Sequence, residues 1–117
     1  MSGPIVMMIS DPPYGNEKPW NALRLAKALA VIHQKVRVFL LGDAVAIAKK
    51  GQQTPTGYYN LGQMLADLIG SGVEVRVCVT CIEARGLKRE DLLDGAEIGK
   101  MLDLARWVEE GSKILNF

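Results

Sequence analysis

Short apolar runs alternate with segments of helical spacing along almost the whole chain, and this alternation restricts the fold more than any other feature. The first run, residues 4–10, is apolar on both faces, which is typical of a strand covered on two sides. Strand and helix then take turns, which predicts a three-layer α/β/α sandwich around a mostly parallel five-stranded sheet. Further strands are expected over 36–41, 73–78, 96–98 and 112–117, and long helices over 17–32, 60–70 and 101–110.

Local signals place several helix ends. Asn60, with Gln63 three residues later, is expected to be the N-cap of the second long helix. Asp43 either orients a ligand or caps a short alanine-rich helix over 44–50, and the capping role is favoured. The last long helix is expected to bury a stripe that consists of Met101, Leu104, Ala105 and Val108.

Length and charge narrow the class of protein. A chain of 117 residues is the size of one domain, so we expect a single domain over 1–117. The formal net charge is +1 and no basic block is interleaved with aromatic residues, which argues against nucleic acid as a partner. No run approaches the about 18 apolar residues of a membrane span, and the first apolar run has no cationic lead-in, so we expect no membrane partner and a cytoplasmic location.

Few side chains in this chain are suited to chemistry. The sequence has two cysteines, Cys78 and Cys81, and one histidine, too few for a tetrahedral metal site within one chain. None of its serines stands in a Gly-x-Ser-x-Gly elbow, and no glycine-rich nucleotide loop follows the first strand. We therefore expect no metal and no cofactor, and sulfur is the expected site of any reaction.

Ligands of open α/β sheets bind beyond the carboxyl ends of the strands, and three segments meet that criterion. One follows the first strand and includes Tyr14 and Gly15, another is Gly42-Asp43, and the third runs from Cys78 to Gly86. Tyr14 either lines a pocket there or covers the core. The candidates for substrate binding are Tyr14, Gly15, Gly42, Asp43 and Thr80.

The third segment carries most information. Thr80 and Glu83 have the spacing of a capping box, which predicts a short helix that begins at Cys81. A helix start favours thiolate over thiol, and Arg85 is expected to add to that effect, so Cys78, Cys81 and Arg85 are the catalytic candidates. The alternative is that both cysteines are small buried apolar residues.

In order and spacing these segments resemble the DsrE/DsrF-like family, which includes the TusD-type sulfur-relay subunits. The resemblance runs through Tyr14-Gly15-Asn16, 36–45, Gly72-Val73-Glu74-Val75 before Cys78, and Ala84-Arg85-Gly86. It implies a Rossmann- or flavodoxin-like sheet with the first strand inside. It also implies a homo-oligomer, trimer or hexamer, in which Cys78 receives a sulfane sulfur as a persulfide and passes it on. The implied partners are small sulfur donors and other sulfur-relay or redox proteins.

Cys81 departs from the pattern of the relay subunits, which do not require a cysteine there. A second thiol so near either resolves a persulfide on Cys78 or serves a dithiol redox function. Two further readings stay open: a non-catalytic interaction subunit with buried cysteines, and a metal site shared between subunits. The leading prediction is a persulfide carrier, a sulfurtransferase of the relay type if it is an enzyme at all.

Overall fold

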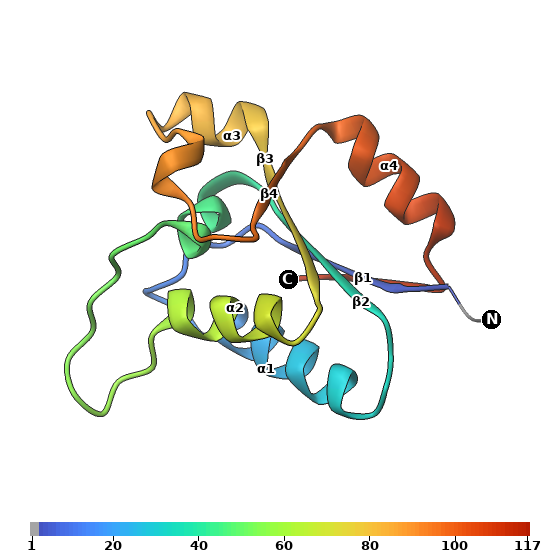
Figure 1. Ribbon diagram of the computed structural model, residues 1–117, viewed down its shortest axis with the longest axis horizontal. Helices are drawn as coiled ribbons and strands as arrows, with labels where there is room; N and C mark the ends of the chain where they lie inside the picture. Colours follow the sequence, from blue (N-terminus) through green and yellow to red (C-terminus); the bar gives the residue numbers. More distant parts are fainter. Residues whose placement is uncertain (1–2) are drawn as a thin grey trace.

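The computed structural model describes residues 3–117, in which strands alternate with helices as expected (Figure 1). Every predicted strand is present within two residues of its expected ends. The strands are β1 (Ile5–Ile9), β2 (Val36–Leu40), β3 (Glu74–Cys78), β4 (Glu97–Gly99) and β5 (Lys113–Asn116). The helices are α1 (Lys18–Val31), α2 (Leu61–Gly70), α3 (Val79–Ala84) and α4 (Met101–Glu110), with the 3₁₀ helices η1 (Gly42–Ala48) and η2 (Arg89–Asp91).

The five strands form one parallel sheet in the order β4-β3-β2-β1-β5. Figure 1 shows α1 and α2 side by side against one face of the sheet and α4 against the other. The predicted three-layer sandwich is therefore confirmed. β1 lies between β2 and β5, and helices cover both faces of the sheet, so Val6, Met7 and Ile9 have no exposed surface.

Helix α4 buries a different side from the one that its apolar spacing predicted. Trp107 and Leu104 are buried, whereas Met101, Ala105 and Val108 are exposed, so the predicted stripe is wrong at those three positions. Trp107 decides the orientation because its ring packs edge-on against Phe39 of β2, with the ring centroids 5.8 Å apart. The burial of one large ring outweighs the burial of the smaller side chains.

The segment after β2 also differs from its prediction. The expected helix over 44–50 is a 3₁₀ helix that begins at Gly42 and ends at Ala48. Its N-cap position is Leu41, so Asp43 lies inside the first turn and its predicted capping role is wrong. The carboxylate of Asp43 is engaged instead by Arg85, which follows α3.

Parallel pairing brings the ends of β2 and β3 to one edge of the sheet. Leu40 is paired with Val77, so the segment 41–43 leaves the sheet beside Cys78, the last residue of β3, and the segment 79–81 that follows it. This edge is where the sequence placed the candidate chemistry.

Candidate functional site

Cys78 is both the last residue of β3 and the N-cap of α3. Its Sγ accepts a hydrogen bond from the backbone amide of Cys81 at 3.4 Å. The predicted start of this helix at Cys81, with Thr80 and Glu83 as a capping box, is therefore wrong: α3 begins at Val79 and sulfur does the capping. We name residues 78–81 the cysteine turn.

Cys78 is the thiolate candidate of the turn. Only 5% of its surface is exposed, and the Thr80 hydroxyl lies 3.4 Å from its Sγ. Burial by itself raises the pKa of Cys78. The side chains and backbone amides of Cys81 and Thr80 outweigh burial and lower the pKa below its ordinary value. A thiol with a lowered pKa is a competent nucleophile near neutral pH.

Cys81 has the opposite character. Its side chain is half-buried, and its Sγ accepts a hydrogen bond from the amide of Gly42 at 3.3 Å. Burial raises the pKa of Cys81, and the neighbouring Cys78 raises it further, against the opposing effect of the Gly42 amide. Within one turn the chain therefore holds one thiol whose pKa is lowered and one whose pKa is raised.

Arg85 is tied to the loop after β2. Its Nε and Nη2 donate to Oδ1 of Asp43 at 3.1 and 2.8 Å, and its Nη1 donates to the carbonyl oxygen of Cys81 at 3.0 Å. Arg85 was expected to stabilise the thiolate, but its guanidinium binds the Asp43 carboxylate and the Cys81 carbonyl oxygen. These bonds join the start of η1 to the end of α3. The structure brings four of the predicted site residues together here. Thr80 lies in the cysteine turn, Gly42 and Arg85 bond to Cys81, and Asp43 bonds to Arg85.

Tyr14 lies at another place in the fold, the start of α2. Its hydroxyl donates to Oε1 of Gln52 at 2.6 Å and accepts from the amide of Leu61 at 3.2 Å. Gly15 follows in a turn with φ of +104°, a conformation that favours glycine. The structure therefore divides the candidate residues between two helix starts, and the hydroxyl of Tyr14 is used inside the protein.

Gln52 is the residue that sequence reasoning missed. Residues 52–57 have the composition of a surface loop, yet the Gln52 side chain is half-buried and donates to the carbonyls of Ala46, Ile47 and Lys49. Its Oε1 also accepts from the amide of Gly62 at 3.1 Å. No spacing rule could reveal this role, because most of its partners are backbone groups, which have no signature in the sequence.

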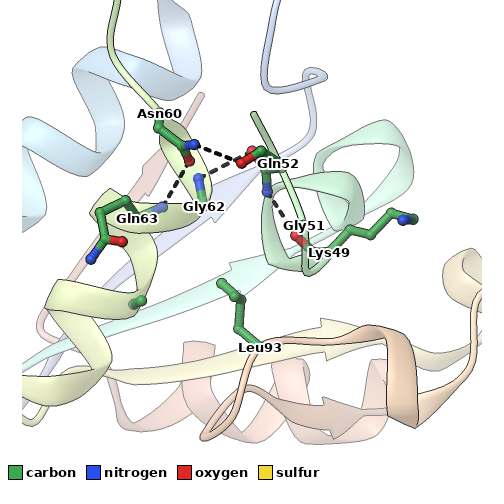
Figure 2. Close-up of a pocket in the computed structure, with 8 residues that line it drawn as sticks. Lys49, Gly51, Gln52, Asn60, Gly62, Gln63 and Leu93 are labelled. Carbon is green, nitrogen blue, oxygen red and sulfur yellow. Dashed lines mark hydrogen bonds between the residues drawn. The ribbon is translucent and has the colours of Figure 1, made fainter. Parts of the chain in front are cut away.

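Figure 2 shows the small cavity beside Gln52, of about 130 Å³. The first amides of α2 lie next to it, but Tyr14, Gln52 and Asn60 already occupy them, with Gln63 N bonded to Asn60 Oδ1 at 3.0 Å as predicted. An anion would have to displace these bonds, so the cavity is a structural feature. It is lined by Lys49, Gly51, Gln52, Asn60, Gly62, Gln63, Ala66 and Leu93.

A larger groove of about 790 Å³ runs between α1 and α2 and is lined by Lys27, Met64 and Leu68 among others. Neither hollow is lined by a residue of the cysteine turn. Across residues 3–117, no three side chains of His, Cys, Asp or Glu are grouped so as to hold a metal ion. The helices of the same residues include none that is long and apolar enough to cross a bilayer.

Fold and site together define a class: small parallel α/β proteins with a hydrogen-bonded cysteine at the carboxyl end of the third strand. The chain belongs to the DsrE/DsrF-like family, whose model matches residues 4–117.

Relatives match over nearly their full length. Protein YchN of Escherichia coli is 41% identical over 115 residues, which cover 97% of each chain. The protein MK0008 of Methanopyrus kandleri is 40% identical over 113 residues, 97% of this chain and 93% of its own. The crystal structure of the E. coli ychN protein has a TM-score of 0.92 at 40% identity and covers 98% of this chain and 99% of that one. MTH1491 of Methanobacterium thermoautotrophicum shares the fold, with a TM-score of 0.76 at 17% identity over 97% and 99% of the two chains.

Proposed function

We propose that this protein is a persulfide carrier in which Cys78 accepts a sulfane sulfur. The observation that carries the proposal is the surroundings of the Cys78 sulfur, which accepts the amide of Cys81 and faces the Thr80 hydroxyl. Those donors, with the Cys81 thiol, lower its pKa despite its burial. Membership of the DsrE/DsrF-like family supports the same chemistry.

The proposed loading step balances without a cofactor. The Cys78 thiolate attacks the outer sulfur of a small hydropersulfide; a new S–S bond forms to Cys78, the donor's S–S bond breaks, and the leaving thiolate takes up the proton of the transferred sulfur. An acceptor thiolate then takes the outer sulfur in the same way and regenerates Cys78. Thr80 and the Cys81 amide stabilise the anion, while Gly42, Asp43 and Arg85 hold the turn in place.

The burial of Cys78 limits the donor. With 5% of the residue exposed, its sulfur is reached by small sulfur compounds or by a narrow thiol of a relay or redox protein. A reducing compartment such as the cytoplasm keeps both cysteines free, as they are here. The proposed sulfur transfer needs neither a metal nor a nucleotide.

We further propose that the protein works as a homo-oligomer, a trimer or hexamer like other members of the DsrE/DsrF-like family. Exposed apolar side chains support this: Met101 and Leu102 at the start of α4 are 63% and 62% exposed, and Val108 and Ile114 are also exposed. Apolar surface of this kind on one helix and the neighbouring strand is typical of a contact between subunits.

A dithiol redox module is the second candidate function, because two free cysteines stand three residues apart at the start of α3, with the Cys81 amide bonded to the Cys78 sulfur. A defined reduction potential in the thioredoxin range and reductase activity that needs both thiols would favour it.

Intact mass after treatment with cysteine hydropersulfide tests the carrier. We expect the Cys81→Ser variant to gain the mass of one sulfur atom and the Cys78→Ser variant to gain none. Thiol titration of the native protein is the control that shows whether reagents can reach the two cysteines. Sulfur uptake by Cys78→Ser equal to that of Cys81→Ser contradicts the assignment, and two unreactive thiols would favour a non-catalytic interaction subunit.

A further inference from the structure

The position of Cys81 across the first turn of α3 suits a bond to Cys78. Residues three apart at a helix start lie on one face, and the Cys-x-x-Cys spacing is that of the thioredoxin-like redox motif. The amide of Cys81 already bonds to the Cys78 sulfur at 3.4 Å, so this sulfur lies against the residue with which it would pair. Both are free cysteines.

Cys81 is also held by two neighbours that Cys78 does not share, Gly42 and Arg85. The Gly42 amide donates to its sulfur at 3.3 Å, and Gly42 adopts a φ of +53° that suits glycine. Arg85 binds its carbonyl oxygen at 3.0 Å and is itself fixed by Asp43. A donor aimed at sulfur stabilises a thiolate, so the Gly42 amide is placed to support an anionic Cys81, against the burial and the Cys78 sulfur that raise the pKa of Cys81 before loading.

We propose that Cys81 is a resolving thiol that expels the sulfur carried on Cys78 as hydrosulfide and leaves a Cys78–Cys81 disulfide for a thiol reductant. This inference rests on the proposed function, because it starts from the Cys78 persulfide. Cys81 attacks Sγ of Cys78; the Cys78–Cys81 bond forms, the bond to the outer sulfur breaks, and that sulfur leaves with the proton of Cys81 as HS⁻. The outer sulfur is reduced and the Cys81 sulfur is oxidised.

Loading itself releases Cys81 for attack. While Cys78 is a thiolate, its charge is one of the causes, after burial, that raise the pKa of Cys81. A persulfide carries its charge on the outer sulfur, about 2 Å farther along the new S–S bond. The opposing charge is thus more distant, while the Gly42 amide stays in place. Cys81 is therefore deprotonated more readily after loading than before it.

The difference in burial also predicts where the reductant attacks. Cys81 is half-buried and Cys78 is 5% exposed, so an incoming thiol reaches the sulfur of Cys81. Cys78 is then the leaving group, and a thiol of low pKa leaves faster. A second equivalent of the reductant thiol releases Cys81 and restores the dithiol, which makes the partner a small thiol or a dithiol protein that binds transiently through Cys81.

The test compares the parent protein, Cys81→Ser and Cys78→Ser under anaerobic conditions. Each is treated with cysteine hydropersulfide, freed of donor on a desalting column, and followed by intact mass and by a sulfide probe, with a mock-treated parent as control. We expect the parent to end two hydrogens lighter, with one equivalent of hydrosulfide released per chain. Cys81→Ser should keep its added sulfur and release at least tenfold less sulfide.

The two proposals fail in different ways. If neither the parent nor Cys81→Ser takes up sulfur, carriage on Cys78 is overturned. If Cys81→Ser loads and the parent retains its persulfide without releasing sulfide, carriage stands and resolution by Cys81 is wrong. Glutathione added to the oxidised parent and quenched early should be found on Cys81 by peptide mapping; an adduct on Cys78 overturns the proposed direction of reductant attack.

Discussion

At the start of α2, the amides of Leu61, Gly62 and Gln63 bond to neutral oxygens: the Tyr14 hydroxyl and the side-chain oxygens of Gln52 and Asn60. At the start of α3, the amide of Cys81 bonds to the sulfur of Cys78. Both starts face the same need, since the first amides of a helix have no partner inside it. The acceptors differ: side-chain oxygens in one place, and a thiol sulfur whose pKa is lowered in the other.

This difference separates structure from chemistry along one chain. The oxygens around α2 are held in several bonds at once, as Gln52 shows, and none is free to react. The bonds to the sulfur at α3 are longer, and the groups that donate to it are the groups that stabilise its charge. The same capping position therefore fixes a loop in one case and lowers a pKa in the other.

The strongest way to break the comparison is Gln52→Ala. The substitution removes three donated bonds and two accepted ones and leaves the buried Gly62 amide without its acceptor. We expect the free energy of unfolding to fall by about 2–4 kcal/mol in urea titrations. Gln53→Ala, at an exposed neighbour, is the matched control and should change stability by about 0.5 kcal/mol or less.

Sulfur loading provides the second half of that experiment. The Gln52→Ala variant, kept well below its unfolding midpoint, should still load Cys78, because the α2 network does not touch the cysteine turn. A loss of loading in folded Gln52→Ala would show that the two helix starts are coupled.

The converse substitution, Cys78→Ser, should alter chemistry with little effect on stability. A serine hydroxyl also accepts an amide hydrogen bond at an N-cap, so the start of α3 is retained. We expect the free energy of unfolding to change by about 1 kcal/mol or less, while sulfur uptake disappears. Thermal and urea unfolding of the reduced protein measure the first quantity, and a loss above about 3 kcal/mol would place Cys78 with the structural caps.

The smallest expected effect is a shift in pH dependence. Because the thiolate is the reactive form and the pKa of Cys78 is lowered, alkylation of Cys78 by iodoacetamide should reach half its maximal rate below the pH of an ordinary thiol. Cys81→Ser keeps a hydroxyl donor to Cys78, whereas Cys81→Ala removes it, so the midpoint should lie at higher pH in the alanine variant. Equal midpoints in the two variants would exclude the side chain of Cys81 as a donor.

The sequence predicted the sheet well and the helix starts less well, for physical reasons. β1 and β3 are visible because burial on both faces or alternation leaves a pattern in the chain, and that pattern put Cys78 at a strand end. The start of α3 was missed because threonine is the usual cap, whereas here sulfur occupies that position. Gln52 was missed because its role depends on carbonyls brought near by folding.

The side of α4 that faces the sheet was also beyond the reach of periodicity. Arg37 and Arg76 of the sheet lie over the Trp107 ring, with guanidinium carbons 5.4 and 5.0 Å from its centroid. Their positive charges are balanced by Glu110 and Asp103 of α4. Helix α4 packs on the sheet through one aromatic ring that contacts two arginines, and a pattern of apolar residues cannot predict such a contact.

The strand order has a consequence for how this chain reaches its fold. β1 pairs on one side with β2, where Ile5 meets Val36, and on the other with β5, where Ile5 meets Lys113. The entropy lost on closing a loop grows with its length, so the pairing with β2 is the cheaper of the two to form from the open chain. Loop entropy thus favours an order in which β5 docks onto a sheet that already exists, and folding is slowed most by the contact between the two most distant strands in the sequence.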